Sequence, residues 1–309
     1  MNVPAALKLI GRGKDGARPL DETQACELFA AALDGRLSDV QLGAFLMAMR
    51  IKGESTAELT GFLRAAQQRA LPLCSPAPVV LLPSYNGSRK LPNLTPLLAR
   101  RLTLAGHRVL VHGTESDPDR ITSADLFAAL RWPVVRSLEA LHEAWGEGLP
   151  AFMSVDLLCP GLARMIGVRR AIGVRGPGHT IAKLLHPVSP APSLRVVNYT
   201  HPEYARAHAE FLQHSGADAL LMRGSEGEPV ADPRRQPRIE VFIGGTSRPD
   251  LSVDLQGGSL PELPPLPTAL DTGAMAAYVA HLLDHPQKIP APIERQVTCI
   301  SACMRALAG

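Results

Sequence analysis

Residues 79–96 constrain the fold of this chain more than any other stretch. Four apolar residues at 79–82 precede a proline-rich loop, and helical periodicity resumes over residues 97–105. A short apolar run bounded by prolines is typical of a buried strand. An open α/β sheet places its ligand crevice at the carboxyl end of such a strand. The stretch therefore predicts a strand, a crevice loop and a helix.

The crevice loop carries charged side chains where anion-binding loops usually carry glycines. Glycine-rich loops bind phosphate through free backbone amides, but this loop has one glycine, Gly87, and three prolines without an amide donor. Arg89 and Lys90 are adjacent cations in the loop, beside Tyr85. Its small polar residues are Ser84, Asn86, Asn93 and Thr95. The loop is either a binding loop that uses side-chain charge or a rigid proline turn with two solvated cations.

Short apolar runs alternate with helical stretches beyond residue 79, which predicts an α/β sheet. The predicted strands are Val79–Leu82, Val109–Val111, Val134–Val135, Phe152–Met153, Arg195–Tyr199, Ala219–Met222 and Ile239–Ile243. Residues 1–72 carry helical patterns with capping residues instead.

Two domains are expected in a chain of 309 residues with this organisation. The helical domain spans residues 1–72 and is completed by about 158–187, and the α/β domain spans 75–157 and 188–309. The proline-rich segments 71–78, 187–192 and 261–267 are predicted to be linkers or turns.

Charge is segregated along the chain, although the net charge is only +3. Residues 59–114 contain seven Lys and Arg and no acid, and residues 157–202 also contain no acid. Residues 115–156, between them, hold eight acids. Such segregation favours a basic surface that faces a polyanion, if it also holds in space.

The five cysteines are an odd number without metal-type spacing, which suits a reducing cytoplasm. The amino terminus has no signal core, and no apolar run approaches a membrane span. We therefore expect a cytoplasmic protein without membrane association, and we nominate no metal site, no cofactor and no catalytic residue.

Four motifs resemble the glycosyltransferase family 3 proteins, which include anthranilate phosphoribosyltransferase and the pyrimidine nucleoside phosphorylases. They are Leu42–Gly53, Ser123-Ala124-Asp125, Arg169–Arg175 and Leu185-His186-Pro187. The resemblance covers essentially the whole chain. It implies a small all-α domain and a large α/β domain with a mixed central sheet, as in the nucleoside phosphorylase and phosphoribosyltransferase class.

The catalytic motifs of the family are replaced. Its Gly-Thr-Gly-Gly-Asp diphosphate loop corresponds to residues 83–87, and its Lys-His-Gly-Asn-Arg motif to residues 111–115, which lack both cations. Its Mg²⁺-binding Asp-Glu pair corresponds to Pro229-Val230, which offers no side-chain oxygen ligand. A shifted metal site that uses Glu226, Glu228 or Asp232 stays open as an alternative. The resemblance makes the small polar residues Ser84, Asn86, Gly87, Asn93 and Thr95 a vestigial substrate loop.

One branch of the family, the YbiB-type proteins, resembles this chain in the replaced positions as well. The shared stretches are Gly11–Lys14, Pro83–Pro96, Gly178–Leu185 and Tyr199–Glu203. This resemblance implies a homodimer joined through the helical domains. It also implies sequence-nonspecific binding of single- and double-stranded DNA and of RNA, without transferase activity.

A nucleic-acid groove needs cations spaced along a backbone track and few acids nearby. The candidate residues are Arg89, Lys90 and Tyr85 of the crevice loop, Arg169, Arg170, Arg175, His179 and Lys183 of the interrupted helical segment, and Arg12 and Lys14 of a glycine-flanked loop. The structural alternatives are salt bridges for the arginines, packing under the loop for Tyr85 and a mobile turn for residues 11–16. Arg234, Arg235 and Arg238 form a further basic cluster, which is either a solvated loop or a nucleic-acid contact.

The sequence thus predicts a DNA- and RNA-binding protein whose groove derives from a transferase active site. An active phosphoribosyltransferase or nucleoside phosphorylase with an altered substrate is the alternative. A third hypothesis is a non-catalytic subunit whose basic surface binds an acidic protein.

Overall fold

The computed structural model describes residues 2–13 and 15–308 and divides into two compact units. One unit comprises Met1–Pro72 and Val155–Pro187, and the other comprises Leu73–Ser154 and Val188–Gly309. Lys14, one of the candidate residues, lies outside the described residues.

The first unit is helical throughout its described elements. They are α1 (Val3–Ile10), α2 (Glu22–Leu33), α3 (Asp39–Lys52), α4 (Thr56–Gln67), α8 (Val155–Leu158), α9 (Pro160–Gly167), α10 (Arg169–Ile172) and α11 (Pro177–Leu184). Asp21, Ser38 and Ser55 begin α2, α3 and α4 with capping boxes, in which the cap side chain and the side chain three residues later satisfy each other's backbone amides.

Three phenylalanines form the centre of this unit. The rings of Phe29 and Phe62 stack at 4.7 Å, and Phe45 meets both edge-on. Such ring pairs add about 0.5–1.5 kcal/mol each to the burial of their area. Gly61 allows the helices to approach closely, because a Cβ there would lie 2.4 Å from the carbonyl oxygen of Glu22.

The second unit contains an eight-stranded mixed sheet in the order β10-β9-β8-β7-β2-β3-β5-β4. The strands are β2 (Val79–Ser84), β3 (Arg108–Gly113), β4 (Val134–Val135), β5 (Ala151–Ser154), β7 (Ser193–Tyr199), β8 (Ala219–Arg223), β9 (Ile239–Ile243) and β10 (Thr246–Ser247). The six neighbouring strands β8, β7, β2, β3, β5 and β4 pair in parallel. β9 pairs antiparallel with β8, and β10 pairs antiparallel with β9. All seven predicted strands lie in this sheet, so the predicted fold class is confirmed.

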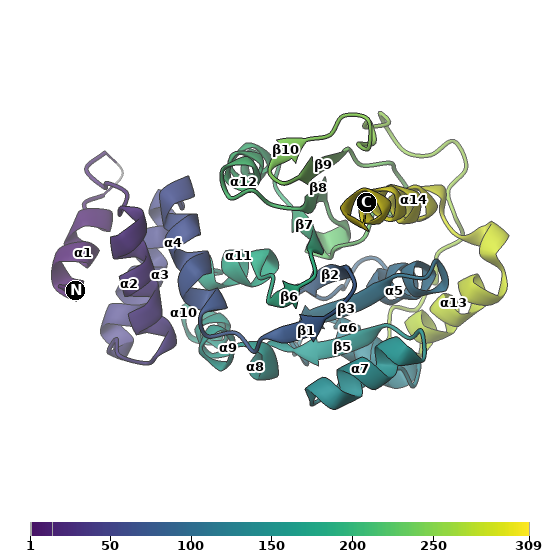
Figure 1. Cartoon of the computed structure of the whole chain (residues 1–309), viewed down its shortest axis with the longest axis horizontal. Helices are drawn as coiled ribbons and strands as arrows, with labels where there is room; N and C mark the ends of the chain where they lie inside the picture. The colour runs from purple at the N-terminus through teal and green to yellow at the C-terminus, as the bar shows by residue number, and fades with distance from the viewer. Residues whose placement is uncertain (1, 14, 309) are drawn as a thin grey trace. The chain divides into compact units, whose positions relative to one another are not determined.

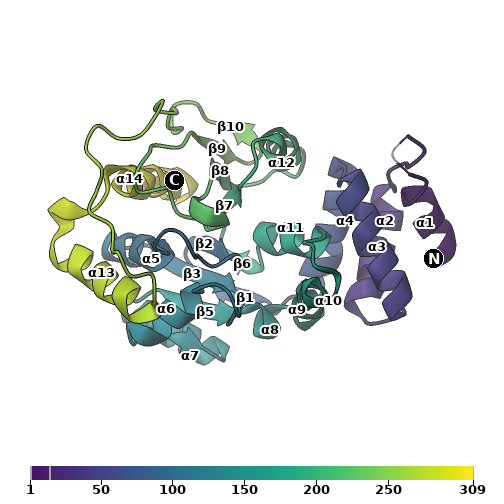
Figure 2. The same ribbon diagram turned by 180° about the vertical axis from the view of Figure 1, so that it is seen from behind.

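Helices cover the sheet of the second unit (Figure 1). They are α5 (Thr95–Leu104), α6 (Ser123–Ala129), α7 (Leu138–Gly146), α12 (Glu203–His214), α13 (Thr272–Asp284) and α14 (Ala291–Ala308), with short 3-10 turns η1 (Ser225–Gly227) and η2 (Pro286–Lys288). Alternate strand residues such as Val80, Leu82 and Val111 share one buried cluster with residues of α5, α13 and α14. Figure 2 shows α13 beside α5 and α6, with which it is in contact. This packing buries β2 completely and fixes the position at which the crevice loop begins.

Two of the predicted linkers contain strands. β1 (Leu73–Ser75) and β6 (Val188–Pro190) form a two-stranded parallel sheet, in which Leu73 pairs with Val188. Both segments contain a boundary between the two units, at 72/73 and at 187/188, as linkers do. The prediction did not include the two strands, and Pro190 is tolerated because it lies at the end of its strand, where a missing amide costs little pairing. Residues 261–267 form no helix or strand, as predicted.

Within the described part of the chain, no helix is both long enough and apolar enough to cross a bilayer.

Candidate functional site

The candidate site lies in the second unit, where the loop after β2 meets the turn after β8. Both strands flank β7 in the parallel part of the sheet, so their carboxyl ends lie at the same edge. The turn contains η1 and Glu228. We divide the loop into an inner half, Ser84–Ser88, which is buried, and an outer half, Arg89–Leu91, which begins with two exposed residues.

The inner half surrounds the carboxylate of Glu228, which is 1% exposed. Glu228 Oε1 accepts the backbone N–H groups of Asn86 (2.9 Å) and Gly87 (2.8 Å). Its Oε2 accepts the hydroxyl groups of Ser84 and Thr95, the latter at 3.3 Å. Converging amides and hydroxyls of this kind are what a loop offers to an anion. Here the protein's own carboxylate takes them.

Asn93 completes this polar network. Its Nδ2 donates to Ser123 Oγ at 3.2 Å, and its Oδ1 accepts the backbone N–H of Thr95 at 3.1 Å. Ser84 Oγ also lies 2.7 Å from Ser123 Oγ. The structure therefore brings together the five residues of the expected vestigial loop, and buries them.

Tyr85 packs beneath the loop, which corrects its nomination as a base-stacking residue. Its side chain is 4% exposed, and its hydroxyl lies 2.8 Å from Nδ1 of His112. Burial lowers the pKa of His112 to about 3, so this imidazole is neutral. A ring enclosed in this way has no face to offer a nucleobase.

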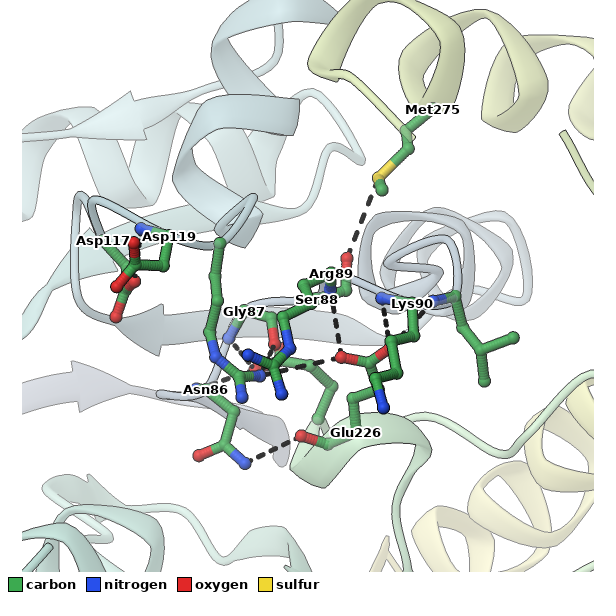
Figure 3. Close-up of polar contacts among 12 residues, drawn as sticks. Asn86, Gly87, Ser88, Arg89, Lys90, Asp117, Asp119, Glu226 and Met275 are labelled. Atoms are coloured by element: carbon green, nitrogen blue, oxygen red, sulfur yellow. Dashed lines mark hydrogen bonds and ion pairs between the residues drawn. The ribbon is translucent and has the colours of Figure 1, made fainter. Parts of the chain in front are cut away.

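The outer half of the loop binds a second carboxylate, that of Glu226 (Figure 3). Glu226 Oε2 accepts the backbone N–H of Arg89 at 3.0 Å, and Oε1 accepts those of Lys90 (2.6 Å) and Leu91 (2.8 Å). Nη1 of Arg120 lies 3.7 Å from Glu226 Oε2 and donates to the carbonyl oxygen of Gly87 at 3.1 Å.

The turn that presents both carboxylates has an unusual backbone. Glu226 has φ 50°, a left-handed conformation that costs a non-glycine residue about 1–2 kcal/mol. Gly227 follows at φ 84°, and a Cβ there would lie 1.7 Å from Nδ2 of Asn86. Asn86 Nδ2 in turn donates to the carbonyl oxygen of Glu226 at 2.8 Å. Loop and turn therefore hold each other in place.

A cavity of about 880 Å³ opens beside the outer half of the loop. The basic residues that line it are Arg89, Lys90, Arg120, Arg223, Arg234, Arg235 and Arg238. Among the described residues of its lining, two are acidic, Glu226 and Asp232. The lining therefore has a strong excess of positive charge.

Asp232 neutralises only part of this charge. It lies 3.0 Å from Arg234 and 3.2 Å from Arg235, so one carboxylate is shared by two guanidinium groups. Burial would raise the pKa of Asp232, but the hydrogen bonds of Arg234 and the charges of both arginines hold it below its usual value. Arg238 pairs with Glu240 at 3.3 Å and stays 64% exposed.

The cavity residues that the sequence analysis did not nominate include Arg120, Tyr199 and Arg223. Arg120 belongs to the acid-rich stretch, between Asp119 and Ile121, and it reaches the loop because the backbone of Ile121 pairs with that of Ser88. No local signal marks it. Tyr199 and Arg223 are the last residues of β7 and β8. The strand-end rule that located the crevice loop would also have found them.

Arg169, Arg175 and Lys183 belong to the same unit as His179, and their charges act on its ring. His179 is 8% exposed, and burial together with these charges lowers its pKa to about 3. Its imidazole is therefore neutral, so it offers a phosphate group no charge. Arg170 and Arg12 are exposed.

Ion pairs with distant acids neutralise part of the charge that is segregated along the sequence. Arg64 pairs with Glu22 and Arg69 with Asp34, both at 2.5 Å. Arg101 pairs with Glu294 at 2.8 Å. Folding supplies acids from distant segments to cations of the acid-free stretch.

The site does not fit the divalent cation that the family resemblance implies. Pro229 and Val230 are buried, and the carboxylates of Glu226 and Glu228 are already held by N–H or O–H donors. Across residues 2–13 and 15–308, no group of three or more His, Cys, Asp or Glu side chains is placed to hold a metal ion.

Comparison with known proteins agrees with this architecture. The model of the glycosyl transferase family helical bundle domain matches residues 5–70. An uncharacterized protein, YbiB of Escherichia coli (strain K12), is 39% identical over 97% of this chain and 93% of its own length. The chain belongs to glycosyltransferase family 3.

Other members of glycosyltransferase family 3 extend the likeness to enzymes. Anthranilate phosphoribosyltransferase of Synechococcus sp. (strain JA-3-3Ab) is 28% identical over 92% of this chain and 82% of its own length. The crystal structure of that enzyme from Thermus thermophilus has a TM-score of 0.69 and 25% identity, and the match covers 98% of this chain and 89% of that chain. The likeness confirms the predicted combination of a small helical domain with a larger α/β domain.

Proposed function

We propose that this chain binds the phosphate backbone of nucleic acid in the cytoplasm, through the basic cavity of its α/β unit and without sequence preference. The observation that carries the proposal is the excess of basic side chains over acids in one cavity. Phosphate groups spaced along a strand are the polyanion that such a lining attracts, and single- and double-stranded DNA and RNA all present them. Tyr199 lines the same cavity and is half-buried, so it offers the ring that Tyr85 cannot.

The loss of phosphoribosyl transfer is part of this proposal. The family's metal-binding pair is replaced by Pro229 and Val230. The backbone N–H groups of Asn86 and Gly87, in the loop that corresponds to the family's diphosphate loop, donate to Glu228 instead. Transfer of a phosphoribosyl group requires a cation to neutralise the diphosphate as it leaves. An active transferase or phosphorylase with an altered substrate is the alternative, supported by the enzymes among its relatives.

The test is fluorescence anisotropy of a labelled single-stranded oligonucleotide at two salt concentrations, with phosphoribosyl diphosphate and Mg²⁺ as competitor. We expect the logarithm of the binding constant to fall by about 0.7 per phosphate contact for each tenfold rise in salt. Any effect of the competitor should not depend on Mg²⁺. Displacement by the competitor only in the presence of Mg²⁺ would favour the enzyme. No binding at low salt would leave an acidic protein as the partner to be sought.

We also propose that two copies associate through the helical unit. Val40, Met47 and Ile51 lie along one side of α3 and are 83%, 37% and 70% exposed. An apolar stripe of this kind on a helix suits a second copy of the same surface. Sedimentation analysis should give twice the mass of one chain, and Ile51→Glu should give single chains.

A further inference from the structure

The amides of the outer half form a site that suits a phosphate group. Three consecutive N–H groups, those of Arg89, Lys90 and Leu91, converge on one carboxylate at 3.0, 2.6 and 2.8 Å. Successive backbone amides that point to one place make an anion-binding concavity. The guanidinium of Arg120 at 3.7 Å adds a positive charge to it.

Glu226, which fills this concavity, can be reached from the cavity. Its side chain is 15% exposed and lines the cavity wall, whereas Glu228 is 1% exposed. The charge of Glu226 also acts on Arg234 on the same wall. An anion that enters the basic cavity therefore meets Glu226, and does not meet Glu228.

We propose that the amides of Arg89–Leu91, together with Arg120, form a phosphate-binding site that Glu226 occupies in the free protein and leaves when a phosphate group enters. For an oligonucleotide this rests on the function proposed above, but the site is defined by its affinity for phosphate itself. A phosphate dianion carries more charge and more acceptor oxygens than a carboxylate, so it competes for the same three donors. Glu226 thereby lowers the affinity of the free protein for single phosphates.

The proposal predicts whether a substitution of Glu226 raises or lowers the affinity for phosphate. Glu226→Ala opens the three amides, so inorganic phosphate should bind about tenfold tighter than to the unsubstituted chain, because charge-assisted hydrogen bonds replace an internal competitor. A structural role alone predicts the reverse, since the loop would lose its support. Asp232→Asn is the matched control, because it removes one negative charge from the same lining without releasing a backbone amide of the loop.

The readout is the ¹H–¹⁵N spectrum of the full chain titrated with inorganic phosphate. In Glu226→Ala we expect the amides of Arg89, Lys90 and Leu91 to shift. The signals of the Asn86 and Gly87 amides, which donate to Glu228, should not shift. Equal phosphate affinities of Glu226→Ala and Asp232→Asn, or shifts confined to other residues, would overturn the proposal.

Glu226→Gln serves if the alanine variant does not fold. It keeps one acceptor oxygen for the loop and loses the charge, so its phosphate affinity should exceed that of Asp232→Asn; equality would again overturn the proposal. A parallel titration with a single-stranded oligonucleotide separates the two proposals. Phosphate binding by the variants without any oligonucleotide binding would refute the nucleic-acid function and leave this site in place.

Discussion

The inner and outer halves of the loop after β2 both surround a carboxylate, but they differ in access. Ser84–Ser88 is buried, and the backbone N–H groups of Asn86 and Gly87 donate to Glu228. Arg89–Leu91 binds Glu226 through its backbone, while Arg89 and Lys90 line the cavity with their side chains. Burial therefore separates the polar residues that hold the loop in the fold from those whose side chains line the cavity.

The largest effect should follow from Glu228→Ala in the inner half. The change leaves two buried N–H groups and two hydroxyls without their acceptor, which should lower the free energy of unfolding by about 3–5 kcal/mol. Urea denaturation measures this loss. Glu228→Gln keeps an acceptor oxygen and should lose less. An alanine variant as stable as the parent chain would show that the inner half is not held by Glu228.

Reversal of charge in the outer half should affect binding and leave stability nearly unchanged. Arg89→Glu combined with Lys90→Glu should weaken oligonucleotide binding about a hundredfold, or about 3 kcal/mol, because two attractive charges become repulsive. Anisotropy titrations measure this change. Arg206→Glu is the control, since Arg206 is 90% exposed on α12 and does not line the cavity. It reverses one charge instead of two, so half that loss of binding free energy in this control would mean that net charge alone matters.

Gly227→Ala tests the contact between the turn and the inner half. A Cβ at this position would meet Nδ2 of Asn86, so we expect a loss of about 2 kcal/mol from strain and displaced packing. Thermal denaturation would report it. Gly216→Ala has a similar φ of 62° with open space around its Cβ, and it should lose clearly less. Similar losses of stability in the two variants would mean that the contact with Asn86 does not cause the loss in Gly227→Ala.

Acid should weaken the inner half through His112, by about 2 kcal/mol between pH 7 and pH 5. The pKa of His112 is lowered from 6.5 to about 3 by burial. The unfolded chain thus binds the extra proton between these values, and the free energy of unfolding falls as pH falls through this window. The slope is up to about 1.4 kcal/mol per pH unit.

His112→Gln should remove the contribution of His112 to the pH dependence of unfolding. The contribution of His179, whose pKa is also lowered from 6.5 to about 3, should remain. Urea midpoints of both chains at pH 7 and pH 5 measure the difference. Parallel pH profiles of the two chains would contradict the assignment.

The sequence predicted the fold well because its signals are local. Capping residues, short apolar runs and the prolines around the loop after β2 each act within a few residues, and all seven expected strands formed. The two short strands β1 and β6 were missed because three residues beside prolines carry too little pattern to separate a strand from a linker.

The candidate site was predictable only in part, because its decisive contacts join distant residues. Arg89 and Lys90 follow from the loop itself. Their backbone partner Glu226 lies more than 130 positions away in the sequence, as does Glu228 from Asn86. Burial, which a single sequence does not reveal, encloses the ring of Tyr85 and leaves the imidazole of His179 without charge.

The separation between this loop and its two carboxylates also has a consequence for how the chain folds. β2 and its loop are synthesised early, but Glu226 and Glu228 follow only after β7 and β8 have been made. Contacts of such long sequence separation are slow to form, because loop-closure entropy is lost before the contact is gained. A nascent chain that ends before residue 224 therefore carries the loop with its amides open to solvent, and the loop reaches its final form when the turn after β8 arrives.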